Sequence, residues 1–352
     1  MSNVAIVGAG FMGSAMAWPL SDNGHHVRLV GTHLDKEIIA SCRASRFHPR
    51  LRRRLPDNVH PYDIEQVGEA LKDVEVVVSG VSSPGVHWIG GALAPHLKPG
   101  MKILAITKGL EANDNGDLRI LPDVLADEIP AALRGQVSIA AVGGPCIAGE
   151  LAGRRQTCVY FTSRNAAVLP ALRALFKTPY YHIALSSDII GVEVCVALKN
   201  AYTLAVGLAE GMLEQIGGVD EAQARNYNPA AALFGATAVE MTRLVSLLGG
   251  NPAKVASIGV GDQYVTCMGG RTVRLGRLLG KGLTYQQARQ EMAGETLESA
   301  FVVAQLAKAL PGLEARGLLQ RDELPVTRAL CRVITGDAPL DLDLSKLFHD
   351  DV

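Results

Sequence analysis

The sequence has no excess of either charge, few aromatic residues and no paired cysteines. Its 34 Lys and Arg are balanced by 35 Asp and Glu, a formal net charge of −1. A chain this close to neutrality has no long-range attraction for phosphate backbones or anionic lipid, so nucleic acid is not an expected partner. None of its six cysteines is in a C-x-x-C pair, which argues against a zinc or disulfide framework and suits a reduced cytoplasm.

Long apolar runs are also missing. No uninterrupted stretch reaches the ~18 residues of a membrane span, and the N-terminus lacks the basic region of a signal peptide. What the chain does have is 352 residues, 48 % of them hydrophobic and 20 % charged, which is the composition of a globular protein. At roughly 100–200 residues per domain, this length predicts two domains or one large one.

The first half of the chain alternates short apolar runs with helical spacing. Near-continuous apolar strands separated by helices predict a parallel sheet covered on both faces. We expect one helix at 11–23, after the first strand. We expect strands at 3–8, 26–30, 74–80, 101–107, 136–143, 156–163 and 180–185.

Strand patterns stop after Ser187, where apolar residues recur at three- and four-residue spacing. We expect helices at 188–211, 228–248, 295–309 and 323–334. The sequence therefore predicts an α/β protein in which residues 1–187 form a doubly wound Rossmann sheet and residues 188–352 form an all-helical domain.

A glycine-rich turn stands at the end of the first strand. Gly8-Ala-Gly10-Phe11-Met12-Gly13 fits G-x-G-x-x-G and opens a helix, as a dinucleotide-binding motif requires. Gly8 makes the tight turn, Gly10 lets the backbone approach a pyrophosphate, and Gly13 packs helix on strand. The anion then meets free N–H groups at the start of the helix. We expect NAD or NADP as cofactor.

The residues at the end of the second strand indicate which of the two cofactors, NAD or NADP, is used. NAD-selective sites usually carry an acidic residue there for the ribose diol. Here the strand ends at Thr32 and His33, which suit a 2′-phosphate, and Asp35 is expected to start the next helix. This favours NADP or dual use. The basic run Arg50–Arg54 is expected to be a solvated loop or to touch a cofactor phosphate or a partner.

Three polar segments follow buried stretches and are candidates for the chemistry. Thr107-Lys108-Gly109 and Gly143–Glu150 each come after a strand, where an α/β sheet places its ligand. Lys199 and Asn200 lie inside an otherwise apolar helix. A lysine in that position is either a surface residue whose stem covers apolar neighbours or a buried functional amine.

These segments also occur, in the same order, in NAD(P)-dependent glycerol-3-phosphate dehydrogenases, and the chain resembles that family along nearly its whole length. The matching segments are 8–13, Thr-Lys-Gly-Leu-Glu at 107–111, Gly-Pro-Cys-Ile-Ala-Gly-Glu at 144–150, Ala-Leu-Lys-Asn at 197–200, Glu-Met-Thr-Arg-Leu at 240–244, and Gly261-Asp262 followed by Thr266-Cys267 and Arg271.

The resemblance implies reversible hydride transfer between NAD or NADP and a small phosphorylated polyol, with sn-glycerol 3-phosphate and dihydroxyacetone phosphate as the default pair. It makes Lys199 the acid/base and gives Lys108 and Asp262 catalytic roles. The substrate residues it implies are Lys108, Gly144, Cys146, Lys199, Asn200, Asp262, Arg271 and Thr272. The cofactor residues are Gly8, Gly10, Phe11, Met12, Gly13, Thr32, Lys108, Ala148, Arg271 and Glu295.

Elementary chemistry agrees with these residue types. Hydride transfer to a ketone builds alkoxide charge, which a nearby ammonium stabilises and protonates. A phosphate on the substrate suits the guanidinium of Arg271, which binds two oxygens at once. A lysine that stabilises the alkoxide in this way makes a metal ion unnecessary for the reaction. No His or Cys residues have the spacing of metal ligands. Without the resemblance, Asp262 reads equally well as a turn residue and Arg271 as a loop charge.

Several positions depart from the family pattern, mostly on the substrate side. They are Cys146, where Ser or Thr is common, and Ala230, Gly270, Thr272 and Thr296. Cys146 reads as a near-isostere of Ser. Sites that hydrogen-bond their ligand reject misfits strongly, so these changes leave the choice of polyol phosphate open.

Three alternatives remain at this stage. The chain could act on a different polyol phosphate, or on a 3-hydroxy acid or ketopantoate-type substrate with the same lysine and asparagine arrangement. A cofactor-sensing protein without turnover would keep the nucleotide fold but would not need Lys108, Lys199 and Asp262. A homodimer in the cytoplasm, active in glycerophospholipid metabolism, is the remaining expectation.

Overall fold

The computed structural model describes residues 1–218 and 226–348, and the chain divides into two compact units. Unit 1 comprises residues 1–108 and 121–193, and unit 2 comprises residues 109–120 and 194–352. The helix α9 (Ile189–Gln215) starts in unit 1 and continues in unit 2. A domain boundary between residues 187 and 188 stays a prediction.

Unit 1 is built on an eight-stranded sheet of order β12-β11-β10-β7-β6-β1-β2-β5. All seven predicted strands are confirmed, and β5, which carries a proline in an interior position, is the one that the pattern missed. The strands of this sheet are β1 (Asn3–Val7), β2 (His26–Val30), β5 (Val59–Tyr62), β6 (Val76–Ser79), β7 (Lys102–Ala105), β10 (Ser138–Gly143), β11 (Thr157–Ser163) and β12 (Tyr181–Ser186).

The sheet is parallel, as predicted, except at one pair, where β11 runs antiparallel to β10. The only helix between these strands is α7 (Ala148–Ala152). A helix of five residues rises about 8 Å, whereas recrossing a six-residue strand takes about 20 Å. The chain therefore re-enters the sheet from the end at which it left. The remaining pairs in this sheet are parallel.

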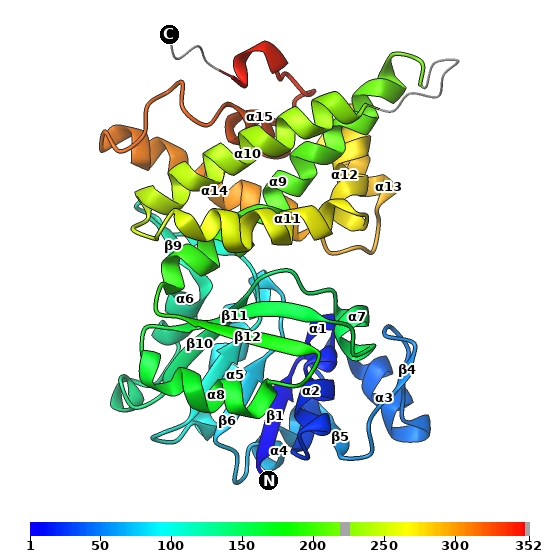
Figure 1. Cartoon of the computed structure of the whole chain (residues 1–352), viewed down its shortest axis with the longest axis vertical. Helices are drawn as coiled ribbons and strands as arrows, with labels where there is room; N and C mark the ends of the chain where they lie inside the picture. The colour runs from blue at the N-terminus through cyan, green and yellow to red at the C-terminus, as the bar shows by residue number, and fades with distance from the viewer. Residues whose placement is uncertain (219–225, 349–352) are drawn as a thin grey trace. The chain divides into compact units, whose positions relative to one another are not determined.

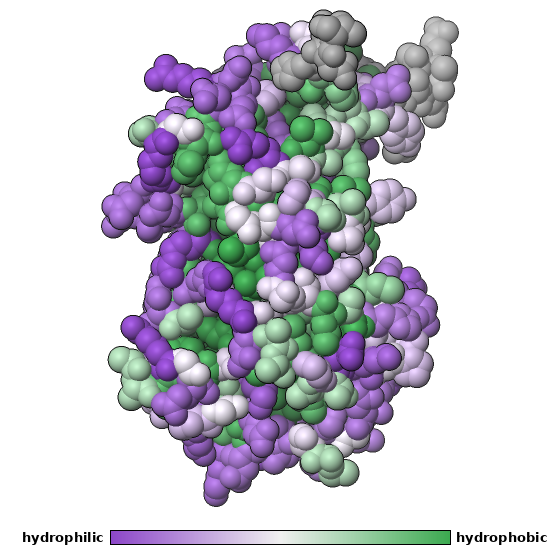
Figure 2. Space-filling view, turned by 60° about the vertical axis from the view of Figure 1, so that its left-hand side comes forward, coloured by the Kyte–Doolittle hydropathy of each residue, from purple (hydrophilic) through white to green (hydrophobic). Residues whose placement is uncertain are grey.

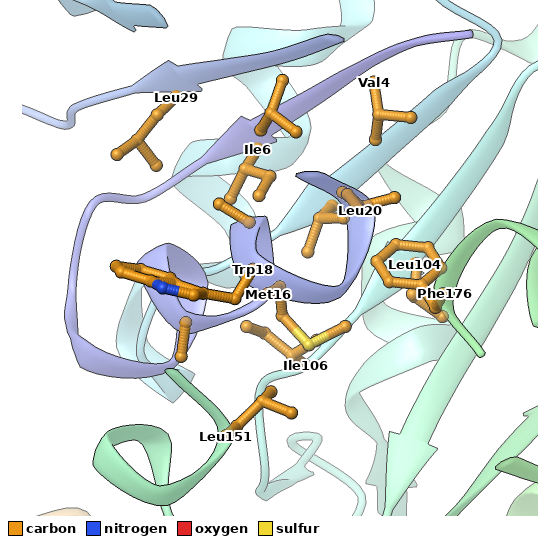
Figure 3. Close-up of a cluster of buried hydrophobic side chains, with 14 of the residues drawn as sticks. Val4, Ile6, Met16, Trp18, Leu20, Leu29, Leu104, Ile106, Leu151 and Phe176 are labelled. Atoms are coloured by element: carbon orange, nitrogen blue, oxygen red, sulfur yellow. The ribbon is translucent and has the colours of Figure 1, made fainter. Parts of the chain in front are cut away.

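Both faces of the sheet are buried, as expected. Along β1, Val4 and Ile6 point into one apolar cluster and Ala5 and Val7 into another. This alternation follows from the two-residue period of a strand. In the first cluster Met16, Trp18, Leu20 and Phe176 pack over the strands (Figure 3). Covering on both faces leaves the ends of the strands as the place for polar chemistry.

The helices of unit 1 flank this sheet (Figure 1). They are α1 (Phe11–Ala15), α2 (Ala17–Asp22), α3 (Lys36–Ser45), α4 (Val67–Ala70), α5 (Val86–Leu93), α6 (Leu121–Asp127), α7 and α8 (Leu169–Phe176). The predicted single helix at 11–23 is divided at Met16. Pro19 explains the break, because it has no N–H to donate to the carbonyl of Ala15.

Unit 2 is helical after the point where strand patterns stop, as predicted. Its helices are α9, α10 (Tyr227–Leu247), α11 (Val260–Cys267), α12 (Arg271–Gly280), α13 (Tyr285–Glu291), α14 (Glu298–Ala315) and α15 (Pro325–Gly336). The last two predicted helices correspond to α14 and α15. The helices α11, α12 and α13 were not predicted, since each is short and follows a glycine-rich or polar stretch.

Two of these helices, α9 and α10, are long and apolar enough to cross a membrane by length and composition alone. In α9, 89 % of the apolar window is buried inside the protein, which accounts for its composition. The corresponding share for α10 is 39 %, and its Tyr227 and Val239 are exposed. On the face shown in Figure 2, hydrophobic residues are visible between hydrophilic ones.

Two hairpins lie outside the main sheet. In unit 1, β3 (Phe47–His48) pairs with β4 (Arg53–Arg54), so the basic run forms the turn and second strand of this hairpin. In unit 2, β8 (Leu110–Ala112) pairs with β9 (Leu118–Ile120) and packs on α14. The Ala112 N–H donates to the Gln305 side-chain oxygen at 2.9 Å. Neither hairpin was predicted.

Candidate active site

The glycine-rich turn of unit 1 has the geometry that a dinucleotide requires. Gly8 has φ +113°, and a Cβ there would lie 2.5 Å from the Gly80 carbonyl oxygen. A Cβ on Gly13 would lie 2.0 Å from the Gly8 carbonyl oxygen, so only glycine allows this approach. A Cβ on Gly10 would meet nothing within 4 Å, which leaves its backbone open to a ligand. The three roles assigned from the sequence fit this geometry.

Two side chains hold Ala9, the residue between the first two glycines. Its N–H donates to Asp35 Oδ2 at 3.1 Å, and its carbonyl lies 3.1 Å from His48 Nε2. His48 Nδ1 accepts from the Leu51 N–H, so Nε2 is the protonated nitrogen. Burial lowers the pKa of His48, which keeps the imidazole neutral. The turn is therefore fixed from both sides.

Asp35 joins the glycine turn to Thr32, just past the end of β2. Besides Ala9, its Oδ2 accepts from the N–H and the hydroxyl of Thr32, at 3.0 and 2.8 Å. It also precedes the first residue of α3, as the sequence predicted, although its side chain caps no helix N–H. Thr32 is buried in this arrangement, whereas His33 is exposed and lies edge-on to Trp88.

Lys108 lies at the carboxyl end of the sheet. It follows β7, and its Nζ donates to the Gly144 carbonyl, just past β10, at 3.2 Å. The two polar segments predicted from the sequence thus meet at one edge of unit 1, as ligand sites of α/β sheets do. Cys146 lies near Met12, with 4.0 Å between their sulfurs. Ala148 begins α7, which packs on α1, and Phe11 at the start of α1 is half-exposed.

Lys199 is the centre of a polar cluster in unit 2. Its side chain is 11 % exposed, and Nζ lies 2.7 Å from Thr266 Oγ1 and 3.3 Å from Asp262 Oδ1. The Thr266 hydroxyl donates in turn to the Asp262 carbonyl. The surface alternative for Lys199 is therefore wrong, because its amine is held among partners from α11. A carboxylate at this distance favours the charged ammonium.

A pocket of about 230 Å³ opens beside this cluster. It is lined by Lys199, Asn200, Thr266, Gly269, Gly270, Arg271, Thr272, Thr296, Leu297, Glu298 and Ser299. Arg271 and Thr272 are the first residues of α12, and Glu298 and Ser299 are the first of α14. Neither helix has a side-chain cap at its N-terminus. Helix N-termini with open N–H groups favour anions.

Close packing of α12 on α9 places Arg271 at this pocket. A Cβ on Gly276 would lie 2.2 Å from the Leu204 carbonyl oxygen, and one on Gly207 would lie 2.6 Å from the Val273 carbonyl oxygen. The two helices therefore touch through their backbones, which only glycines permit. Because α9 carries Lys199, this contact determines how near the start of α12 comes to the lysine.

A π-helical turn precedes Asp262. It covers Val255–Gly259 and runs directly into α11. Such turns shift the register of the side chains that follow and are frequent at functional sites. A Cβ on Gly259 would lie 2.3 Å from Met241 Sδ, so the turn is packed tightly against α10. The result is that Asp262, which is almost fully buried, faces Lys199.

Glu295 and Ala230 do not line this pocket, although Glu295 directly precedes Thr296, which does. Glu295 forms an ion pair with Arg274 of α12, at 2.7 Å, so its cofactor role stays a prediction. Ala230 lies in the first turns of α10 and does not line the pocket. Among residues 1–218 and 226–348, no group of three or more His, Cys, Asp or Glu is placed to hold a metal ion.

Sequence reasoning missed two residues that shape the site. His48 carried no signal except its place next to Pro49 and the basic run, and Thr266 was quoted only as part of a motif. Glu193, in the first turns of α9, was also overlooked: it is fully buried and neither carboxylate oxygen has a hydrogen-bond partner. A charged residue inside an apolar run was the available signal for it.

Known proteins match both parts of the chain. The family model for the N-terminus of NAD-dependent glycerol-3-phosphate dehydrogenase matches residues 3–169, and that for its C-terminus matches residues 188–343. The NADP(+)-dependent glycerol-3-phosphate dehydrogenase of Archaeoglobus fulgidus is 38 % identical over 82 % of this chain and 83 % of its own. The glycerol-3-phosphate dehydrogenase [NAD(P)+] of Bacillus cereus is 31 % identical over 95 % and 92 %.

A solved structure agrees with this assignment. The glycerol-3-phosphate dehydrogenase of Coxiella burnetii superposes with a TM-score of 0.79 at 27 % identity and covers 98 % of this chain and 96 % of its own. Full-length matches in sequence and structure confirm the resemblance drawn from the motifs. The chain belongs to the NAD-dependent glycerol-3-phosphate dehydrogenase family of oxidoreductases.

Proposed function

We propose that this protein catalyses reversible hydride transfer between NAD or NADP and a small phosphorylated polyol, with sn-glycerol 3-phosphate and dihydroxyacetone phosphate as the pair. The observation that carries the proposal is the buried amine of Lys199, paired with Asp262 beside a pocket with Arg271 and two open helix N-termini. The names of the Archaeoglobus and Bacillus relatives support the same reaction.

The glycine turn fits the cofactor. Gly10 leaves open space where a pyrophosphate would approach, while Ala9 is held by Asp35 and His48 so that the turn is formed in advance. When bound, the nicotinamide supplies or accepts the hydride. Lys108, at the same edge of unit 1, is proposed to bind substrate next to the cofactor.

Lys199 is proposed as the acid and base of the reaction. In the direction of ketone reduction, its ammonium donates a proton to the oxygen that gains negative charge. Asp262 keeps the amine charged, so the resting site is prepared for reduction. Oxidation of the alcohol requires the neutral amine, and it should therefore gain from a higher pH.

Arg271 and Thr272 are proposed to bind the substrate phosphate. The guanidinium offers a bidentate contact, and the uncapped N–H groups at the start of α12 add donors. Glu298 lines the same pocket and disfavours a second anion there. Asn200, on α9 next to Lys199, is proposed to bind a substrate hydroxyl.

Substitution of Lys199 tests the reaction. We expect Lys199→Ala to lower kcat by about 10²–10⁴-fold, the usual contribution of a general acid, while cofactor binding is retained. Lys281→Ala, at the far end of α12 and half-exposed, is the matched control and should keep full activity. Near-normal turnover in Lys199→Ala would refute the assignment.

Substitution of Arg271 tests the phosphate site separately. We expect Arg271→Ala to raise the KM for dihydroxyacetone phosphate by about tenfold to a hundredfold, the value of one or two charged hydrogen bonds. The KM for cofactor should change little. Arg277→Ala, on the same helix but paired with Glu214, is the control. Equal rises in both KM values would mean that Arg271 does not bind the substrate phosphate.

The choice of substrate needs a direct assay, because several positions differ from the family pattern. They are Cys146, Ala230, Gly270, Thr272 and Thr296. We propose following NADH and NADPH absorbance with dihydroxyacetone phosphate, with four- and five-carbon ketose phosphates and with ketopantoate. Preference for ketopantoate would replace a phosphorylated substrate by a carboxylate. Cofactor binding without turnover of any of these compounds would favour a sensing role.

Assembly and location are also proposals. A homodimer is supported by the partly exposed apolar helix α10, which carries Tyr227 and Val239 on its surface. Light scattering of the purified protein tests it. A cytoplasmic location and a role in glycerophospholipid metabolism are supported by the six free cysteines and by the family, respectively.

A further inference from the structure

The basic run around the β3–β4 hairpin is not used by the reaction proposed above. Six of the 34 Lys and Arg residues lie within residues 38–56, and no Asp or Glu occurs in that range. The rest of the chain therefore has 28 basic against 35 acidic residues. A protein that is nearly neutral as a whole thus concentrates positive charge at this hairpin, and such a local excess attracts anions even without a net charge.

Packing holds three of these arginines on the surface. Leu51 and Leu55 are buried in an apolar cluster of unit 1, while Arg52, Arg53 and Arg54 between them are exposed. The first strand of the hairpin is anchored as well, because its histidine contacts the glycine turn. The three guanidinium groups are therefore displayed by a segment that is fixed at both ends.

Neighbouring arginines are paired with acidic side chains, but these three are not. Arg43 forms an ion pair with Asp63, and Arg46 lies 3.6 Å from Asp57. Within residues 1–218 and 226–348, the side chains of residues 52–54 take part in no ion pair or hydrogen bond. Their charge is available to a partner outside the chain.

An exposed aromatic ring lies beside them. Phe47 pairs with Arg54 across the hairpin, and His48 pairs with Arg53. Directly opposite residues share one side of a hairpin, and consecutive residues alternate. Because His48 points to the glycine turn, Phe47 and Arg54 point away from it. Phe47 is 42 % exposed, and the hairpin lies at the outer edge of unit 1, next to α3 (Figure 1).

The backbone of Arg52 also favours an external role for its charge. Its φ is +54°, a left-handed conformation that glycine adopts without steric cost and other residues adopt at some cost. The Arg52 side chain makes no ion pair or hydrogen bond within the described residues that would offset this cost. We call Phe47 and residues 52–54 the hairpin patch.

A lipid surface fits this patch better than a nucleic acid does. A bilayer can be touched at one place, whereas a long polyanion would continue past the patch along a protein whose other residues are acidic in sum. Proteins that bind single strands stack bases on a series of aromatic side chains, and the patch has one such ring. An aromatic ring among basic groups suits the headgroup region, where the ring leaves water while the cations meet phosphates.

We propose that the hairpin patch docks this protein reversibly on membranes that contain anionic lipid. Arg52, Arg53 and Arg54 face the lipid phosphates, and Phe47 enters the headgroup region. Three charges and one ring give a peripheral attachment. The cytoplasmic leaflet carries anionic lipid, so this docking agrees with the cytoplasmic location proposed above.

Vesicle flotation tests the proposal without any need for turnover. The probes are vesicles of phosphatidylcholine alone and vesicles in which about one third of the lipid is phosphatidylglycerol. We expect the protein to float with the anionic vesicles only. Salt at about 1 M should release it, because the Debye length then falls to about 3 Å.

Variants of the patch assign the binding to its residues. Each arginine should contribute about fivefold to the affinity for anionic vesicles, so the triple variant Arg52→Ala/Arg53→Ala/Arg54→Ala should bind about a hundredfold more weakly. Phe47→Ala should bind about threefold to tenfold more weakly, from the loss of its apolar contact. Arg50 is left in place because it lines a separate pocket past β2.

Two controls separate this effect from net charge and from folding. Lys72→Ala/Lys98→Ala/Lys177→Ala removes the same charge from other exposed points of unit 1 and should bind like the unaltered protein. Arg52→Gly relieves the left-handed backbone, so its melting temperature should not fall, whereas its affinity for anionic vesicles should drop about fivefold.

Several results would overturn the proposal. They are a lack of flotation, equal flotation with neutral and anionic vesicles, and equal losses in the arginine and lysine triple variants. Binding of a single-stranded oligonucleotide without flotation would replace the lipid by a nucleic acid. Each result is independent of dehydrogenase activity, so failure of the docking and failure of the proposed reaction are distinguishable.

Discussion

Glu193 allows a quantitative test of the electrostatics of this fold. It is fully buried in the first turns of α9, and neither carboxylate oxygen has a hydrogen-bond partner. Burial raises the pKa of this carboxyl from 4.5 to about 8, against a smaller lowering by the positive charge of Lys108, while Asp123 adds to the rise. The folded protein therefore holds the proton through neutral pH.

The sign of the effect on stability follows from proton binding. Between pH 4.5 and about 8, the folded state keeps the proton of Glu193 while the unfolded chain loses it. The free energy of unfolding then falls as pH rises, by up to about 1.4 kcal/mol per pH unit. From pH 5 to pH 7 the loss from this one group amounts to about 2.5 kcal/mol.

The variant Glu193→Gln keeps the shape of the side chain and removes the titration. We expect its stability relative to the unaltered protein to increase by about 2.5 kcal/mol between pH 5 and pH 7. Urea unfolding followed by circular dichroism across this range measures the difference. Parallel stability curves for the two proteins would refute the reasoning, because they would mean that Glu193 titrates alike in both states.

Glu240→Gln is a comparison variant for this experiment, because burial raises the pKa of Glu240 as well. Glu240 is also buried, but its carboxylate accepts from the N–H groups of Val326 and Thr327 and from the Thr327 hydroxyl. An amide cannot accept all three bonds equally well, because one end of it is a donor. This substitution should therefore destabilise the protein, by about 1–3 kcal/mol.

Two further predictions concern the site. Gly13→Ala should destabilise the protein by about 1–3 kcal/mol, because the new Cβ would lie 2.0 Å from the Gly8 carbonyl oxygen. Gly10→Ala should leave the melting temperature unchanged and weaken NADPH binding. Equal melting temperatures for the two variants would contradict this prediction. Asp262→Asn should lower kcat for ketone reduction, because Lys199 loses the carboxylate at 3.3 Å that holds its amine. Steady-state rates measure the change, and an unaltered kcat would mean that Asp262 does not support this amine.

The fold was predictable to the extent that it depends on local pattern. Runs of Val, Ile and Ala predicted seven strands of the sheet. Because these runs alternate with segments of helical spacing, the sequence also predicted that helices cover both faces of the sheet. The pattern could not show that β11 reverses, because this depends on the length of α7 compared with that of β10. It could not show the β8–β9 hairpin either, since that hairpin is stabilised by contacts with α14, almost 200 residues away.

The site was predictable in its residue types and less so in their partners. The glycine turn follows from steric rules that act within a few residues, so Gly8, Gly10 and Gly13 could be assigned roles from their spacing. Lys199 stood out because an amine in an apolar helix is costly to bury. Its contact with Thr266, 67 residues further along, could be identified only in the folded protein.

The sequence by itself thus determined the class of fold, the nucleotide turn and the candidate lysine, because each depends on short-range sterics or on local hydrophobic period. Tertiary structure alone decided that Asp35 holds the turn, that His48 anchors the basic hairpin and that Glu193 is buried without a partner. These outcomes depend on which surfaces meet when distant segments pack, and the direction of a side chain is set by those neighbours and not by its own place in the sequence.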